Sequence, residues 1–212
     1  MTSNWLDECD KQCRFFIEQE DIIDIAHDIQ HIERVVKTAK QLAREEQAIL
    51  AVVVPAAWLH DCFSVPKNHP DRAKASLISA DKAVRFLSNI SYPAQYYEGI
   101  HHAICAHSFS ANILPETLEA KIVQDADRLD ALGAIGIARC MQVSGALGRC
   151  LYSLEDPFCE QRLPNDSEFT IDHFFNKLFN ITATLNTKTA VKEGVLRERR
   201  MREFLYQLSQ EV

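Results

Sequence analysis

Apolar residues recur three and four positions apart along most of the chain, which is the spacing of one buried face of an α-helix. In residues 28–46, Ile32, Val35, Val36 and Ala39 form such a stripe. The alternation of apolar and polar residues that marks half-buried strands is scarce. The spacing predicts helices over 4–19, 28–46, 48–63, 70–89, 93–107, 115–133, 134–143, 168–179 and 188–210. The sequence therefore predicts an all-α fold.

The length of 212 residues and the hydrophobic content of 47% suit one compact domain, which we expect to span residues 1–212. The formal net charge of −7 disfavours an extended nucleic-acid interface. Seven cysteines without a Cys-x-x-Cys pair indicate free thiols in a reducing cytoplasm. The longest apolar run, residues 48–59, is too short to cross a bilayer, and the N-terminus lacks a secretory signal, so no membrane partner is expected. The sequence does not indicate an oligomeric state.

The pair His60-Asp61 ends an apolar run that begins at Ile49. Burying an imidazole and a carboxylate costs free energy unless both groups are paired or bound to a metal. These two groups are also common ligands of Zn, Mn and Fe ions. The pair is therefore a candidate metal site, and the alternative is a hydrogen-bonded pair at a helix end.

Further candidate ligands lie on both sides of this pair. His27 and His31 are four residues apart and share one helical face, although His27 also suits a capping role and His31 a hydrogen-bonded place in the core. Asp125, Asp127 and Asp130 lie on an otherwise apolar helix. Asp127 and Asp130 share a face, and surface pairing with Lys121 and Arg128 is the alternative.

Three more histidines, His101, His102 and His107, lie in one predicted helix. The last two are five residues apart, or about 140° around a helical wheel. They could converge on one site only if the helix ends near His107.

The strings His31-Ile-Glu-Arg-Val35, His60-Asp61 and Ala126-Asp127-Arg-Leu129 resemble the H…HD…D signature of the HD-domain metal-dependent phosphohydrolases. Longer strings, such as Ala106-His107-Ser-Phe-Ser, are similar to a bacterial branch of small HD hydrolases. The resemblance covers residues from about 20 to 180. It implies a helical bundle with a metal held between helices, and the C-terminal helices 168–210 are expected to pack on that core.

The resemblance also implies roles for individual residues. By motif position the metal ligands would be His31, His60, Asp61 and Asp127. His102 and His107 match positions that bind a second metal or the phosphate in some HD proteins. The cofactor would be one or two divalent ions among Mn, Mg, Fe, Ni, Co and Zn.

The implied reaction is hydrolysis of a phosphoester, such as a nucleotide or a related small molecule, by a metal-activated water. Asp61 would orient that water. Phosphate recognition needs cations, and Lys67 is a candidate because its loop follows the His-Asp pair and could act as a lid. The other candidate cations are Arg72, Arg128 and Lys177.

Two other functions fit the same residues. A di-iron pair would support oxygenase chemistry, as in some HD-fold enzymes, and an iron-dependent oxygen uptake assay would separate it from hydrolysis. A non-catalytic helical binding module would merely hydrogen-bond these polar groups, and failure to bind any divalent metal would favour it.

Overall fold

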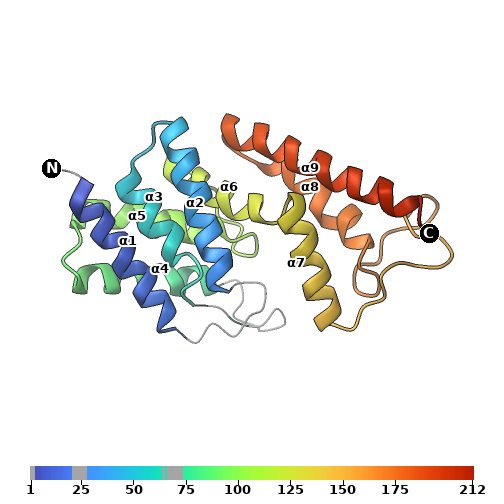
Figure 1. Ribbon diagram of the computed structural model, residues 1–212. Helices are drawn as coiled ribbons and strands as arrows, with labels where there is room; N and C mark the ends of the chain where they lie inside the picture. The colour runs from blue at the N-terminus through green and yellow to red at the C-terminus, as the bar shows by residue number, and fades with distance from the viewer. Residues whose placement is uncertain (1–2, 21–27, 64, 66–73) are drawn as a thin grey trace. The chain divides into compact units, whose positions relative to one another are not determined.

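The computed structural model describes residues 3–20, 28–63, 65 and 74–212 (Figure 1). This part of the chain is helical apart from turns, loops and one isolated bridge between Cys150 and Phe169. The prediction of an all-α fold is therefore confirmed. The helices are α1 (Ser3–Glu18), α2 (Ile29–Glu45), α3 (Leu50–Leu59), α4 (Ala75–Asn89), α5 (Tyr97–His107), α6 (Leu118–Asp130), α7 (Gly133–Ala146), α8 (Phe179–Ile181) and α9 (Lys188–Ser209). Short 3-10 helices cover Ala94–Tyr96 and Thr182–Thr184, and a π-helix covers Phe174–Leu178.

The chain consists of two compact units, Met1–Asp127 and Arg128–Val212, within which the residues mainly contact one another. The division falls inside α6. Grouping residues by their contacts does not show whether either unit folds by itself. The expectation that residues 1–212 form a single domain therefore stays a prediction.

Helix α3 is the centre of the first unit, where it packs against α1, α2, α4 and α5 (Figure 1). Its residues 51–59 are all buried, as their apolar sequence predicts. A helix that is hydrophobic on every face belongs in the interior. The His-Asp pair at its end is thereby fixed to the most enclosed element of the unit.

A proline inside α3 is accommodated by a tyrosine from another segment. Pro55 has no backbone N–H, so the carbonyl of Ala51 loses the donor that a helix normally supplies. The hydroxyl of Tyr92 donates to that carbonyl at 2.6 Å. The buried carbonyl of Ala51 therefore has a hydrogen-bond donor, and α3 continues past the proline to Leu59.

Several predicted helix boundaries differ from the structure, and three of the differences have a clear local cause or consequence. Helix α3 ends at Leu59 rather than near residue 63, so His60 is its C-cap. A turn separates α6 from α7, because Gly133 adopts a φ of 73°, a left-handed conformation that glycine tolerates best. Residues 168–171 are not helical and precede the π-helix.

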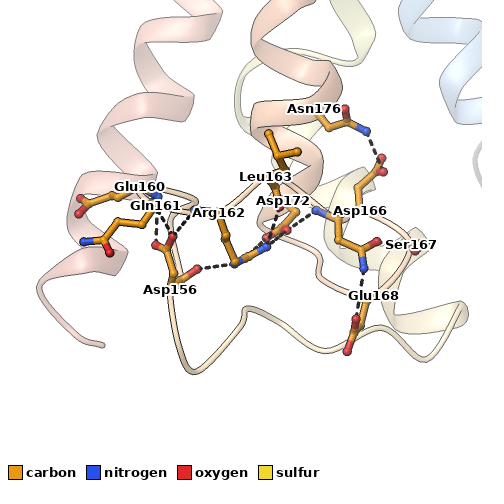
Figure 2. A network of polar contacts seen from close by, with 11 residues as sticks. Asp156, Glu160, Gln161, Arg162, Leu163, Asp166, Ser167, Glu168, Asp172 and Asn176 are labelled. Atoms are coloured by element: carbon orange, nitrogen blue, oxygen red, sulfur yellow. Dashed lines mark hydrogen bonds and ion pairs between the residues drawn. The ribbon is translucent and has the colours of Figure 1, made fainter.

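In the second unit, α9 packs against α7, and the residues before the π-helix are held by a polar network (Figure 2). The buried carboxylate of Asp172 accepts two hydrogen bonds from the guanidinium of Arg162, one of them at 2.7 Å, and one from the amide of Asn165. Asp156 accepts from three successive backbone amides, those of residues 160–162. These bonds give a long loop a defined conformation without regular secondary structure.

Candidate metal centre

Four helix ends of the first unit bring the candidate ligands together. His31 lies in the first turn of α2, where the Asp28 side chain caps the helix by accepting the His31 amide at 2.8 Å. His60 and Asp61 follow α3, and Asp127 lies in the last turn of α6. His107 is the last residue of α5. The group is therefore assembled from elements that are distant in sequence.

The donor atoms lie close to one another. Nε2 of His31 is 3.4 Å from Oδ1 of Asp127. Nε2 of His60 is 3.5 Å from Oδ2 of Asp61 and 4.0 Å from Oδ1 of Asp127. The ligand atoms of His31, His60 and Asp127 all lie within 4.8 Å of one another.

The imidazole of His60 is fully buried, and its orientation is fixed by α3 itself. Its Nδ1 donates to the carbonyl of Ala57 at 2.8 Å. That carbonyl belongs to the last helical turn, where carbonyls lack an intrahelical donor. Burial lowers the pKa of His60 to about 4, so the ring is neutral near pH 7. Its proton is therefore on Nδ1, and Nε2 carries a lone pair.

That lone pair indicates the kind of group that His60 can bind. Nε2 of His60 is buried and makes no hydrogen bond within the described residues. It faces the oxygens of Asp61 and Asp127, and a lone pair and carboxylates facing each other repel. A cation among them would turn this repulsion into attraction.

A divalent cation fits these distances. Two ligands that each bind one ion at about 2.1 Å are at most about 4.2 Å apart. The three separations between histidine nitrogens and aspartate oxygens, 3.4, 3.5 and 4.0 Å, satisfy this limit. The His31 and His60 side chains are 1% and 0% exposed, whereas those of Asp61 and Asp127 are 18% and 29% exposed. The group is thus accessible to solvent on its carboxylate side.

His107 joins this group through Asp61. Its Nε2 lies 3.3 Å from Oδ1 of Asp61, and its Nδ1 donates to the carbonyl of Ile104 at 2.6 Å. Burial lowers the pKa of His107, but the hydrogen bond and charge of Asp61 outweigh burial and leave this pKa raised. Together with His60 and Asp61, His107 forms a second group of possible ligands.

The carboxyl group of Asp127 is held in its charged form. Burial raises its pKa, but the adjacent His31 imidazole, together with His60 and His107, outweighs burial and holds the pKa well below its usual range. Asp127 therefore offers a negative charge to a cation at any pH near neutrality.

Other candidate residues are placed elsewhere or lie outside the described residues. Nε2 of His102 accepts the amide of Glu116 at 3.0 Å, and His102 is in neither ligand group. Nε2 of His101 is 3.0 Å from Asp81. The guanidinium of Arg128 donates to the carbonyl of Thr184. Lys177 is exposed on the π-helix of the second unit. Outside the described residues are His27, Lys67 and Arg72.

Two acidic residues on the same helices as His31 and Asp127 pair with arginines. Asp130 pairs with Arg139 of α7 at 2.9 Å, and Glu33 pairs with Arg14 of α1 at 2.8 Å. The acceptor for Nδ1 of His60 is instead the backbone carbonyl of Ala57. Backbone acceptors orient both His60 and His107 here.

Residues 28–132 match the HD-domain family model. The protein YpgQ of Bacillus subtilis (strain 168) is 33% identical over 191 residues, which cover 88% of this chain and 84% of that protein. An HD-superfamily hydrolase from Bacillus thuringiensis is similar in structure, with a TM-score of 0.75, 31% identity and 97% of each chain covered. The crystal structure of Bacillus subtilis YpgQ in complex with ADP has a TM-score of 0.74 and 29% identity, and covers 98% of this chain and 96% of that chain.

The chain belongs to the HD-domain family. This membership and the hydrolase neighbours support a metal-dependent hydrolase in general. HD domains bind divalent metals, in agreement with the two groups of His and Asp residues. No helix within the described residues is both long and apolar enough to span a bilayer.

The buried state of His60 predicts an unusual titration in the metal-free protein. Its pKa of about 4 lies below the value of about 6.5 for an unfolded histidine. Between these pH values the unfolded chain binds a proton that folded His60 does not, so this residue lowers stability progressively as the pH falls from about 6.5 to about 4. An NMR titration of the His60 ring, assigned with His60→Gln, should give a midpoint near pH 4. A midpoint near 6.5 would contradict the neutral, buried imidazole.

Proposed function

We propose that the protein is a metal-dependent phosphohydrolase that acts on a nucleotide or a related small phosphoester. The observation that carries this proposal is the buried Nε2 of His60, which faces two carboxylates at distances that suit a shared cation. The ligands would be His31, His60, Asp61 and Asp127.

Similarity to a nucleotide complex supports the substrate class. The Bacillus subtilis relative YpgQ is known as a complex with ADP, and nearly the whole of this chain is similar to it. A nucleoside phosphate also suits a site rich in imidazole and carboxylate, because a bound divalent ion supplies the positive charge that phosphoryl oxygens require.

The side chains support one cation more directly than two. His60 is common to both ligand groups, but its Nδ1 is already bonded to Ala57, so only Nε2 remains for a metal. One nitrogen binds one cation. We therefore assign a single ion to His31, His60 and the two aspartates.

When bound, such an ion lowers the pKa of a water molecule and so supplies a nucleophile near neutral pH. Asp61 is the group that would orient this water, because its side chain is partly exposed and its two oxygens face different partners. Oδ2 faces the shared His60 nitrogen, and Oδ1 faces His107. A proton on Nε2 of His107 would hold Asp61 in this orientation.

Recognition of the phosphate would need cations beyond the metal. We retain Lys67 and Arg72, which follow the His-Asp pair in the sequence, together with Arg128 and Lys177, as candidates. The guanidinium of Arg128 also donates to the carbonyl of Thr184.

A substrate panel tests the proposal. The full chain is stripped with EDTA, reloaded with Mn²⁺ and incubated with ADP, other nucleoside phosphates and a general phosphodiester. Chromatography should detect phosphate or pyrophosphate release from at least one nucleotide, and EDTA should reduce release to background. Adding Mn²⁺ back should restore it.

The same preparations address the two other functions. Oxygen uptake by the iron-loaded protein without phosphate release would favour a di-iron oxygenase. Tight Mn²⁺ binding with no turnover of any substrate would contradict hydrolysis of these compounds, and absence of metal binding would favour a binding module.

A further inference from the structure

The chain directly after the His-Asp pair is fixed by α4. Helix α3 ends at Leu59, and the following residues 60–63 form a turn in which the Cys62 amide donates to the Leu59 carbonyl at 3.2 Å. A turn of this kind would leave the direction of the Asp61 side chain poorly defined unless other groups hold it. Ser79 and Lys82 of α4 hold the turn itself.

Ser79 bonds to this turn in three ways. Its hydroxyl accepts the amide of Phe63 at 3.2 Å and donates to the carbonyl of Phe63 at 3.0 Å. Its own carbonyl accepts from the thiol of Cys62 at 3.4 Å. The Ser79 side chain is fully buried, so solvent cannot substitute for these bonds.

Lys82, one turn further along α4, also bonds to the turn that follows Asp61. Its ammonium donates to the carbonyl of Cys62 at 3.1 Å and also pairs with Glu20. Both residues that follow Asp61 are therefore bound to α4 through their backbones, and Asp61 itself has His60 on one side and this fixed segment on the other.

We propose that Ser79 is a positioning residue of the metal site, with Lys82 in support. Ser79 holds the backbone of Phe63, and Lys82 holds the backbone of Cys62, so that the Asp61 carboxylate meets the same cation as His60. Because side chains that orient metal ligands typically change affinity by about 10- to 100-fold when removed, loss of the Ser79 hydroxyl should weaken metal binding measurably. The inference rests on the proposed metal site.

Ser76 provides a matched control on the same helix. It is buried like Ser79, but its hydroxyl makes no hydrogen bond within the described residues. Ser76→Ala therefore makes the same chemical change, one turn away, without touching the turn after His60. Ser79→Thr keeps the hydroxyl and serves as the rescue variant.

The experiment measures Mn²⁺ affinity of the metal-free full chain from the EPR signal of free Mn²⁺, well below the unfolding temperature of each variant. Ser79→Ala should weaken binding by about 10-fold, Ser76→Ala should bind as wild type does, and Ser79→Thr should restore most of the affinity. Hydrogen exchange of the Phe63 amide should accelerate in Ser79→Ala alone.

The outcomes separate the inference from the proposed function. Wild-type affinity in Ser79→Ala, or equal weakening in Ser76→Ala, overturns the positioning role and leaves the metal site intact. Failure of the wild-type protein to bind Mn²⁺ overturns the metal site and this inference with it. If Ser79→Ala does not fold, Lys82→Met is judged by the same criterion, because it removes one bond to Cys62 and keeps the alkyl chain.

Discussion

A His60→Ala variant is expected to lose at least about 100-fold in Mn²⁺ affinity and all metal-dependent phosphate release. Mutation of a residue that only orients a metal ligand typically lowers metal affinity by about 10- to 100-fold, so removal of a ligand itself should cost at least the upper end of this range. His60 contributes a fully buried nitrogen that lies within 4.0 Å of both carboxylates, those of Asp61 and Asp127. Calorimetric titration with Mn²⁺ and metal analysis of the purified protein would measure the loss, and circular dichroism should show that most helicity remains.

His101→Ala is the matched control for this variant. His101 also lies on a helix of the first unit, but its ring pairs with Asp81 at a partly exposed position and belongs to neither ligand group. This control should bind Mn²⁺ as the wild-type protein does. Full metal occupancy in His60→Ala would remove the proposed site.

The positions of the helices could be predicted from the sequence because most of the helices bury one face. Periodicity predicted the stripe of α2, and the structure buries Ile32, Val35, Val36 and Ala39. The residue at which α3 ends could not be predicted, because an apolar run does not indicate where the helical hydrogen bonds stop. This end matters for function, since it makes the Ala57 carbonyl available to His60.

The two candidate histidines of α5 show the same dependence on helix ends. The sequence established that His102 and His107 could not share a face unless the helix ended near the second of them. Helix α5 does end at His107, whose ring lies with its centroid 4.9 Å from that of His60. His102 remains on the helix and accepts the Glu116 amide. The family resemblance implied a role for both His102 and His107, but only His107 lies beside Asp61 in the fold.

Contacts between distant segments could not be predicted. Asp130 shares a predicted face with Asp127, yet it pairs with Arg139 of α7, the helix that follows the turn at Gly133. Ser79 gave no signal at all, since a serine within an amphipathic helix is ordinary. Its contact with Phe63 spans 16 residues and exists only after α4 packs against the end of α3.

Divalent cations are expected to stabilise the folded protein strongly. A ligand that binds only the native state adds about 4 kcal/mol when present at about 1,000 times its dissociation constant. For a chain of this size each kcal/mol raises the unfolding midpoint by about 2–4 °C, so Mn²⁺ should raise it by about 8–16 °C. The physical reason is relief of the repulsion between the His60 lone pair and the two carboxylates, all of which are close together only after folding.

Thermal unfolding followed by circular dichroism, with and without Mn²⁺, measures this shift. Asp127→Asn keeps the shape of the side chain and removes its negative charge, so its midpoint should respond little to Mn²⁺. The metal-free variant should also be less acid-sensitive than the metal-free wild-type protein, because the low pKa of Asp127 contributes stability that is present above the pKa of the unfolded carboxyl and is lost as the pH falls below it. An equal Mn²⁺ response in wild type and Asp127→Asn would show that the cation stabilises the fold from elsewhere, since the carboxylate beside His31 would then have no part in binding it.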